Sequence, residues 1–199
     1  RVLTVRSFTE EQPGSTVNVE QPMVADDTQF AADVNEQINK IVDQYIEEAN
    51  QRIAEYREAF LATGGTEEEF EQKNIQVDVN YEILSETEDR VSFVLRAAES
   101  DISAGKEIVY YNLDLATGQV LTLEDVLGED WVNICNSSIQ EQMAANTDVS
   151  YFSEDQGGFT TVDENTSFYL DEDGSVVVVF PKYSIAPGAY GEQTFRIDA

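Results

Sequence analysis

The sequence predicts an α+β domain in which a mainly antiparallel sheet packs against a long N-terminal helix and a second, shorter helix. Apolar residues recur at steps of three and four over residues 28–62, which indicates one amphipathic helix. Between residues 76 and 197, β-branched and aromatic residues gather in short runs separated by turn residues, which is typical of strands. A hydrophobic content of 41% is enough for a folded core despite the high charge.

The first fifteen residues predict a flexible tail or linker, because Pro13 and Gly14 close a stretch of turn-forming composition. Val17 and Val19 then alternate with polar residues up to Pro22. Because proline cannot donate to a strand ladder, this run predicts an edge strand.

The helical stripe from Thr28 to Ala62 would measure about 52 Å at 1.5 Å per residue. Asp26, Asp27 or Thr28 is placed to cap it, and the Thr63-Gly64-Gly65 run to end it. A compact domain of this size has a radius of gyration of roughly 16 Å. We therefore expect the helix to protrude, to kink or to stop early, and the predicted place of a break is Glu55–Glu58.

Three more strands are predicted after this helix, at Gln76–Glu86, Arg90–Ala98 and Glu107–Leu115, with turns at residues 87–89 and 103–105. The spacing of Thr122 and Asp125 is that of a capping box, which predicts a short helical turn ending at Leu127. The second helix is predicted over Trp131–Met143, with Cys135 on its apolar face.

Residues 145–166 lack periodicity but hold aromatic residues, so we expect them to pack. A hairpin with its turn at Asp171–Gly174 is predicted to join strands at Ser167–Leu170 and Val176–Phe180, and a last strand covers Gln193–Ile197. We expect a single domain over residues 16–199, made of an N-terminal module (about 16–104) and a C-terminal module (about 105–198).

The charge balance excludes several classes of partner and of chemistry. The chain has 11 Lys and Arg against 40 Asp and Glu, a formal charge of −29, and no His. A surface this acidic repels nucleic acid and disfavours an anionic membrane surface, since both are bound through basic patches. Without His there is neither a Ser-His-Asp system nor an imidazole-ligated zinc site. Carboxylates, Tyr, Ser, Thr, Lys and one thiol remain for chemistry. Our prediction is a protein that is not an enzyme and that carries no cofactor and no metal.

The remaining chemical motifs are better explained by local structure. Asp171-x-Asp173-Gly174 is similar to part of a calcium loop, but strand residues follow at once. The runs Glu67–Glu69 and Asp26-Asp27 suit helix N-termini. Among forty carboxylates some pair will always suit a glycosidase, so no pair is informative. Cys135 has no basic neighbour on its helix face, which predicts a buried, inert thiol.

The distribution of charge is more informative than its sum. Between Lys106 and Lys182 lie 75 residues that hold 15 acidic side chains and no Lys, Arg or His. We expect this block to present a strongly negative face that steers a cationic partner. Solubility or adaptation to salt explains the same pattern equally well.

A segment rich in Pro and Gly, residues 181–191, bridges the last two predicted strands and holds two tyrosines. Proline stiffens the segment and tyrosine offers contact area at low entropic cost, which is typical of a pre-organised recognition loop. The alternative is a plain crossover packed on the sheet. The predicted partner-binding residues are Pro181, Tyr183, Pro187 and Tyr190 in the loop, with Asp171 and Glu172 as an acidic rim.

A set of motifs runs through the C-terminal half, namely Phe168-Tyr-Leu170, Gly174, Val177–Gly191 and Phe195-Arg-Ile197, preceded by Tyr110–Asp114, Thr117-Gly118, Leu123–Leu127 and Ile134–Gln142. On these residues the chain resembles the C-terminal module of RsiV-type anti-sigma factors. The N-terminal half, with the strand around Val19 and a long helix containing Asn35 and Asn39, is similar to the companion module of that family. The resemblance covers about residues 16–198.

The resemblance implies an extracytoplasmic domain at the cell surface, anchored in the full-length protein by a membrane span, that binds lysozyme and signals to a sigma factor. Lysozyme is cationic, so the acidic block favours the same class of partner. The same pair of modules precedes polysaccharide deacetylase domains, which leaves a cell-wall glycan-binding or accessory module as the alternative and a purely structural spacer as a third. The chain begins at Arg1 rather than Met, so we expect a targeting segment upstream.

Overall fold

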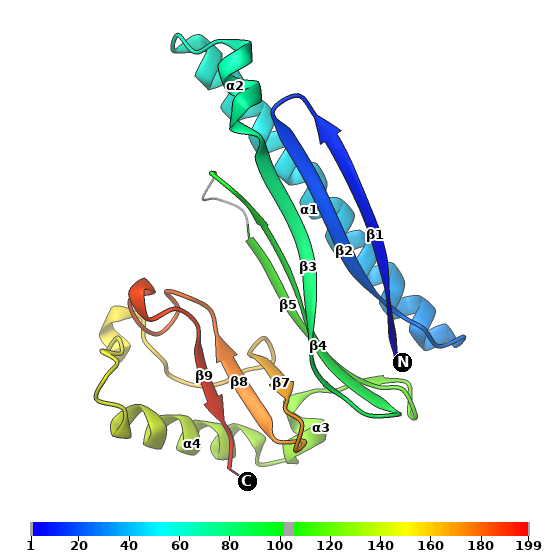
Figure 1. Cartoon of the computed structure of the whole chain (residues 1–199). Helices are drawn as coiled ribbons and strands as arrows, with labels where there is room; N and C mark the ends of the chain where they lie inside the picture. Colours follow the sequence, from blue (N-terminus) through cyan, green and yellow to red (C-terminus); the bar gives the residue numbers. More distant parts are fainter. Residues whose placement is uncertain (1, 102–105, 199) are drawn as a thin grey trace. The chain divides into compact units, whose positions relative to one another are not determined.

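The computed structural model describes residues 2–101 and 106–198 and confirms the α+β class (Figure 1). Its strands are β1 (Leu3–Gln12), β2 (Ser15–Val24), β3 (Ile75–Glu86), β4 (Arg90–Glu99), β5 (Lys106–Asp114), β6 (Gln119–Val120), β7 (Ser167–Leu170), β8 (Val176–Phe180) and β9 (Gln193–Arg196). Its helices are α1 (Gln29–Ala62), α2 (Glu67–Lys73), α3 (Leu123–Leu127) and α4 (Trp131–Ala145), with 3-10 turns at Glu154–Gln156 and Gly188–Tyr190. The turn expected at residues 103–105 lies outside the described residues.

The chain forms two compact units. The N-terminal unit comprises Arg1–Ile83, Val94–Val109 and Leu115–Gly118, and the C-terminal unit comprises Leu84–Phe93, Tyr110–Asp114 and Gln119–Ala199. Strands β3, β4 and β5 therefore each contribute residues to both units. This division differs from a module boundary near residue 104, because it falls within strands rather than at a linker.

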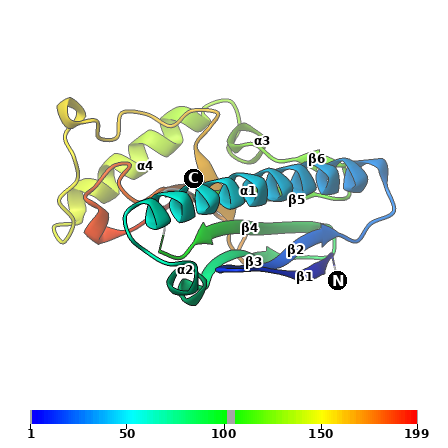
Figure 2. The ribbon, with the colours of Figure 1, turned by 90° about the horizontal axis from the view of Figure 1, so that it is seen from above.

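The strands lie in two sheets, one with the order β1-β2-β3-β4-β5-β6 and the other with the order β7-β8-β9. β1 and β2 are antiparallel, in a register that runs from Leu3↔Val24 to Gln12↔Ser15. β2 and β3 are parallel over Ser15–Val19 and Ile75–Val79, because α1 and α2 carry the chain back between them. In the N-terminal unit α1 lies along one face of β1, β2 and β3 (Figures 1 and 2).

Residues 3–12 form a strand and not the expected flexible tail. All of β1 pairs with β2 across the two-residue turn at Pro13 and Gly14, where Gly14 has a φ of 92°. With β1 beside it, β2 is an interior strand rather than the edge strand that Pro22 suggested. Proline is tolerated there because pairing with β3 ends at Val19, before Pro22 is reached.

Helix α1 runs without a break through Glu55–Glu58, where an interruption was expected. Its N-cap is Thr28, whose hydroxyl accepts a hydrogen bond from Ala31 N at 3.1 Å. The buried stripe follows the expected helical spacing and consists of Ala31, Val34, Ile38, Val42, Tyr45, Ala49 and Ile53.

The C-terminal turns of α1 continue because α2 covers them. Phe70 of α2 is fully buried, and its ring centroid lies 5.8 Å from that of Tyr56 and 6.0 Å from that of Phe60. Lys73 Nζ lies 4.8 Å from the Phe60 centroid. After Ile53 the last turns of α1 carry no buried residue of their own. The aromatic cluster supplies apolar contacts to these turns and so stabilises the helix up to its end.

Two asparagines of the family resemblance fasten α1 to β2. Asn35 Oδ1 accepts a hydrogen bond from Val24 N at 2.8 Å, and its Nδ2 donates to Val24 O at 3.1 Å. The fully buried Gln21 donates from Nε2 to Asn39 Oδ1. These contacts satisfy polar groups at the end of β2 and fix the helix against the strand.

A buried ionic contact ties α1 to β4. The Glu99 carboxylate, whose side chain is 0% exposed, accepts from Arg52 Nε at 2.7 Å, from the Arg52 guanidinium again at 3.1 Å and from Tyr45 Oη at 2.8 Å. Burial, with the bond to Glu99, raises the pKa of Tyr45 above its usual range. The bond to Glu99 raises the pKa of Arg52 as well. The contact keeps a buried carboxylate fully paired.

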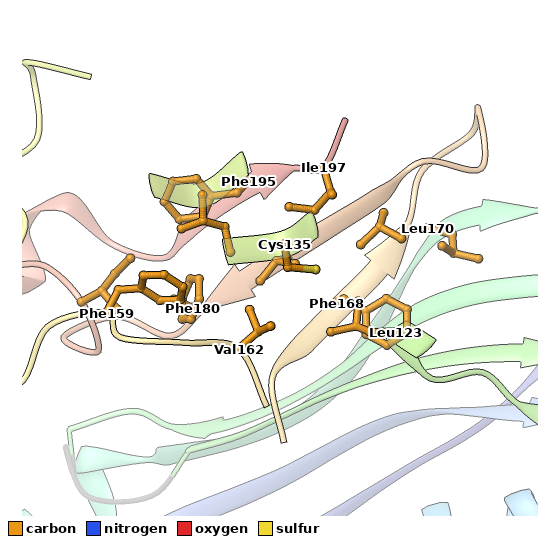
Figure 3. Close-up of a cluster of buried hydrophobic side chains, with 13 residues drawn as sticks. Leu123, Cys135, Phe159, Val162, Phe168, Leu170, Phe180, Phe195 and Ile197 are labelled. Atoms are coloured by element: carbon orange, nitrogen blue, oxygen red, sulfur yellow. The ribbon is translucent and has the colours of Figure 1, made fainter. Parts of the chain in front are cut away.

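The C-terminal unit has its own core, formed by α3, α4 and the three-stranded sheet (Figure 3). Its buried side chains are Leu123, Cys135, Ile139, Phe159, Val162, Phe168, Leu170, Val176, Val178, Phe180, Ile185, Phe195 and Ile197. The predicted second helix is confirmed as α4, and the capping box of Thr122 and Asp125 opens α3. Phe159 and Val162 show that the segment without periodicity packs, as expected.

Polar side chains in the C-terminal unit satisfy backbone groups of β7. Asn112 Nδ2 donates to Phe168 O at 2.9 Å, and Asn112 Oδ1 accepts from Leu170 N at 3.2 Å and from Ser92 Oγ at 2.7 Å. Ser85 Oγ donates to Leu170 O at 2.6 Å. All three polar residues are buried, so β7 is paired by side chains where a neighbouring strand would otherwise be needed.

Candidate protein-binding loop

The recognition loop, defined as Pro181–Gly191, joins β8 to β9 within the C-terminal unit. Ser184 N donates to Pro181 O at 3.0 Å, which closes a turn at the start of the loop. Tyr190 N donates to Pro187 O at 3.1 Å in the 3-10 turn at its end. Both ends of the loop therefore have a hydrogen-bonded conformation.

The middle of the loop is anchored in the core. Ile185 and Ala186 are 3% and 2% exposed, and Ile185 belongs to the hydrophobic cluster drawn in Figure 3. Ile185 O also accepts a hydrogen bond from Phe152 N at 2.9 Å. Because this middle section cannot move without opening the core, the residues on either side of it are presented from a rigid base.

Tyr183 is the more exposed of the two tyrosines, at 69%. Its φ of 72° lies in the left-handed region that residues other than glycine rarely adopt. The ring lies against Gly188, where a Cβ atom would overlap ring atoms Cε1 and Cζ. Lys182 Nζ lies 5.3 Å from the ring centroid. An exposed ring held by a strained backbone and two neighbours is pre-organised for contact with a partner.

Tyr190 is 40% exposed and is the last residue of the 3-10 turn. Pro187, with a φ of −53°, is the N-cap of that turn, and Pro181 is exposed at the start of the loop. The structure thus places the four predicted loop residues on one short segment, with both tyrosines open to solvent.

The predicted rim acids lie elsewhere. Asp171 and Glu172 belong to the β7–β8 turn, whereas the recognition loop leaves the opposite end of β8, about 13 Å away along a five-residue strand. Asp171 Oδ1 accepts from Asp173 N at 3.0 Å and from Ser175 N at 2.9 Å, so it serves the turn itself. Glu172 is exposed. The structure therefore does not bring this pair together with the loop.

Other acidic residues lie closer to the recognition loop. Phe152, which bonds to Ile185, is followed two residues later by Glu154 and Asp155, and both of these side chains are exposed. The sequence shows that these acidic residues are present, but it does not predict which of them lie next to the recognition loop.

The C-terminal unit is strongly negative as a whole. It holds 19 Asp and Glu against three Lys and Arg. Arg196, one of the three, is paired with Asp171 at 3.5 Å and with Asp173 at 3.0 Å. The field of this unit attracts cations and repels anions.

Two observations concern thiol and metal chemistry in the described residues. Burial raises the pKa of the Cys135 thiol to about 11, so the thiolate that a nucleophile requires is absent at neutral pH. Within residues 2–101 and 106–198, no group of three or more Cys, Asp and Glu side chains is placed to hold a metal ion. In the same residues no helix is long and apolar enough to cross a membrane.

Sequence reasoning missed the residues that shape the loop. Gly188 and Ile185 hold Tyr183 and the middle of the loop, yet neither has a motif of its own. Gly188 itself was the available signal, because a glycine lacks a Cβ and so permits close approach of a neighbouring group.

Comparison with known proteins confirms the resemblance. Residues 124–199 match the family DUF3298, described as proteins of unknown function. The chain is 24% identical over 204 residues to the anti-sigma-V factor RsiV of Bacillus subtilis (strain 168), a match that covers 99% of this chain and 67% of the relative.

Two solved structures share the fold. A member of the DUF3298 family from Bacteroides fragilis NCTC 9343 superposes with a TM-score of 0.66 at 17% identity, covering 98% of this chain and 90% of the other. A DUF3298 family protein from Pseudomonas aeruginosa PAO1 gives a TM-score of 0.54 at 16% identity, covering 98% and 88%. At this level of identity the likeness concerns the fold alone.

Proposed function

We propose that this RsiV-like DUF3298 module is an extracytoplasmic recognition domain that binds a cationic protein of the lysozyme type through the recognition loop. In the full-length protein, binding is then signalled to a sigma factor. The similarity to an anti-sigma factor supports this class of function over an enzyme.

The observation that carries the proposal is the pair of exposed tyrosines on a braced loop. Tyr183 and Tyr190 lie on either side of Ile185, which is buried in the core. This contact restricts the conformations of the loop in the free protein, so little conformational entropy is lost on binding. Aromatic side chains in such positions commonly provide the main contacts of a protein interface. Truncation of a central anchor costs about 2 kcal/mol or more, which corresponds to roughly thirtyfold in affinity.

The charge of the C-terminal unit supports a basic partner. With 19 acidic against three basic residues, this unit accelerates encounter with a cationic protein and repels an anionic one. Exposed acids act mainly on the association rate, because they attract the partner over a distance before contact. Added salt weakens this attraction, since ~0.15 M salt screens charges beyond about 8 Å. Glu154 and Asp155, near the loop, should therefore matter more than Glu172 at the other end of β8.

Titration calorimetry distinguishes this function from its rival. The protein is titrated with a c-type lysozyme and, separately, with soluble peptidoglycan fragments. We expect binding of the lysozyme, weakened by added salt, and no binding of glycan. Binding of glycan without lysozyme would instead establish a cell-wall glycan-binding module and overturn the proposal.

The loop assignment is tested with a double variant, Tyr183→Ala and Tyr190→Ala. Alanine keeps the Cβ at the left-handed position 183, so the substitution adds little backbone strain. Val5→Ala, which truncates a 52% exposed apolar side chain in β1, is the matched control. With folding verified by circular dichroism, the double variant should lose most of its affinity for lysozyme and the control none. Unchanged affinity in the double variant would exclude the loop.

A further inference from the structure

A concave site lies in the C-terminal unit, away from the recognition loop in sequence. It is a cavity of about 420 Å³ formed where β6, α3, the start of α4 and residues 163–168 meet. Its apolar lining includes Leu121, Leu123, Trp131 and Phe168. Leu123 and Phe168 belong to the core and lie side by side in Figure 3, so the floor of the cavity is rigid.

Three carboxylates line the same cavity, at Glu124, Asp163 and Glu164, and no Lys or Arg does. Asp163 Oδ1 already accepts from Asn165 N at 2.8 Å, so it belongs to the local turn. Glu124 and Glu164 are exposed, and their side chains have no hydrogen bond or ion pair with any residue in the described part of the chain. The cavity therefore combines an apolar, aromatic floor with two free negative charges at its rim.

We propose that this cavity receives an arginine side chain of a cationic protein partner. The apolar wall suits the methylene stem of arginine, and the Trp131 indole offers a face on which a guanidinium stacks. Glu124 and Glu164 then supply the carboxylates that pair with its N–H groups. Lysine fits less well, because an ammonium neither stacks nor binds in a bidentate manner.

Carboxylates compensate the partial positive charge of the two helix N-termini near the cavity, so these termini do not repel a bound cation. The N-termini of α3 and α4 carry partial positive charge, but Asp125 lies in the first turn of α3 and Asp130 is the N-cap residue of α4. With these two carboxylates at the helix ends, the charge close to the cavity is negative. The class of partner rests on the proposed function, whereas the cavity is separate from the recognition loop, so the two proposals can fail independently.

Trp131 is the only tryptophan of the chain, so its fluorescence reports on this cavity directly. The probe is a tetra-arginine amide peptide, which contains no tryptophan. A tetra-citrulline amide peptide, isosteric but uncharged, and a tetra-lysine amide peptide are the comparisons. We expect the arginine peptide to change the intensity and wavelength of Trp131 emission in a saturable way, the citrulline peptide to have no effect, and the lysine peptide to bind several times more weakly.

Matched charge variants separate the cavity from general attraction to an acidic surface. The variant Glu124→Gln, Glu164→Gln should bind tetra-arginine about fivefold or more weakly, whereas Glu141→Gln, Asp148→Asn, which removes two exposed charges elsewhere in the unit, should change binding less than twofold. Equal losses in the two variants, binding without a change in Trp131 emission, or equal affinity for the lysine peptide would overturn the proposal.

The loop variant Tyr183→Ala, Tyr190→Ala should keep the full tetra-arginine response. If lysozyme does not bind but the arginine response persists, the proposed function fails and the cavity assignment stands. If lysozyme binds but the peptide does not perturb Trp131, the cavity assignment fails alone.

Discussion

At the scale of single residues, the recognition loop depends on the absence of a side chain at Gly188. The Tyr183 ring occupies the space that a Cβ would need, while the backbone at Gly188 is part of a 3-10 turn that alanine also adopts. A methyl group at this position therefore conflicts with the orientation of the ring and not with the fold.

Gly188→Ala is expected to displace the exposed Tyr183 ring and to leave the thermal unfolding temperature almost unchanged. Both tyrosines remain, but the loop is no longer pre-organised, so affinity for lysozyme should fall about tenfold. Calorimetry and a thermal melt measure the two quantities. Ala189→Gly, at an exposed neighbouring position, is the control. Full affinity in Gly188→Ala would show that the orientation of Tyr183 is unimportant.

Ionisation of the buried Cys135 thiol makes the free energy of unfolding depend on pH in the alkaline range. Burial raises the pKa of its thiol to about 11, above the value in the unfolded chain, so the unfolded state loses its proton first as the pH rises. The free energy of unfolding should thus fall by up to about 2 kcal/mol as the pH rises from about 9 through 11.

Urea unfolding at about pH 8 and pH 10.5 measures this loss. Cys135→Ala removes the thiol, so the decrease in its unfolding free energy over this interval should be smaller than in the parent. Tyr45, whose pKa is also raised by burial, contributes to the remaining decrease. An equal decrease in both proteins would contradict the assignment.

The sequence alone could not show which acidic residues border the recognition loop and which stabilise local structure. The composition placed Asp171 and Glu172 in an acidic block, and this much followed from the sequence. That both lie in the hairpin turn, at the end of β8 away from the recognition loop, already follows from the predicted hairpin, whereas the ion pair of Asp171 with Arg196 depends on the pairing of β8 with β9. The exposed tyrosines, by contrast, stood out because their proline and glycine neighbours are a local signal.

At the scale of elements, β7 is held by side chains as well as by a strand. One side of β7 pairs with β8, and Asn112 bonds to both Phe168 O and Leu170 N. Asn112→Ala would leave the buried Phe168 O without this partner, at a cost of about 1–3 kcal/mol, and would leave Leu170 N with only its 3.3 Å bond to Ser92 Oγ.

Asn112→Ala is therefore expected to destabilise the protein by about 2 kcal/mol or more in urea unfolding. Asn133→Ala, which removes an exposed asparagine from α4, should change the unfolding free energy by less than about 0.5 kcal/mol. Similar small effects of the two substitutions would mean that water replaces the lost bonds and that β7 does not need Asn112.

Helices and strands whose pattern lies within a few neighbouring residues were predicted well. Those that form only through contacts with segments distant in the sequence were not. The capping box, the α4 stripe and the β7–β8 hairpin all follow from residues a few positions apart. β1 was missed because it is exposed along nearly its whole length and is a strand only by pairing with β2. The uninterrupted α1 was missed because the ring that covers its end is that of Phe70, which lies in another helix.

At the scale of the whole molecule, the question is whether two compact units unfold separately. Strands β3, β4 and β5 each contribute residues to both units, so a unit cannot unfold without ending three strands in their middle. Loss of ladder hydrogen bonds at three places at once makes such a partly unfolded state costly. We therefore expect one cooperative transition, as in small single domains.

Two probes test this expectation because they report on different units. Trp131 lies in the C-terminal unit, whereas the 34-residue α1 in the N-terminal unit dominates the helical circular dichroism signal. In urea, tryptophan emission and ellipticity at about 222 nm should give coincident curves with the same midpoint and slope. Cys135→Ala, which weakens the C-terminal core, should shift both curves together, because a cooperative chain loses α1 when that core is lost. A shift of the emission curve alone would mean that the units unfold independently despite the strands they share.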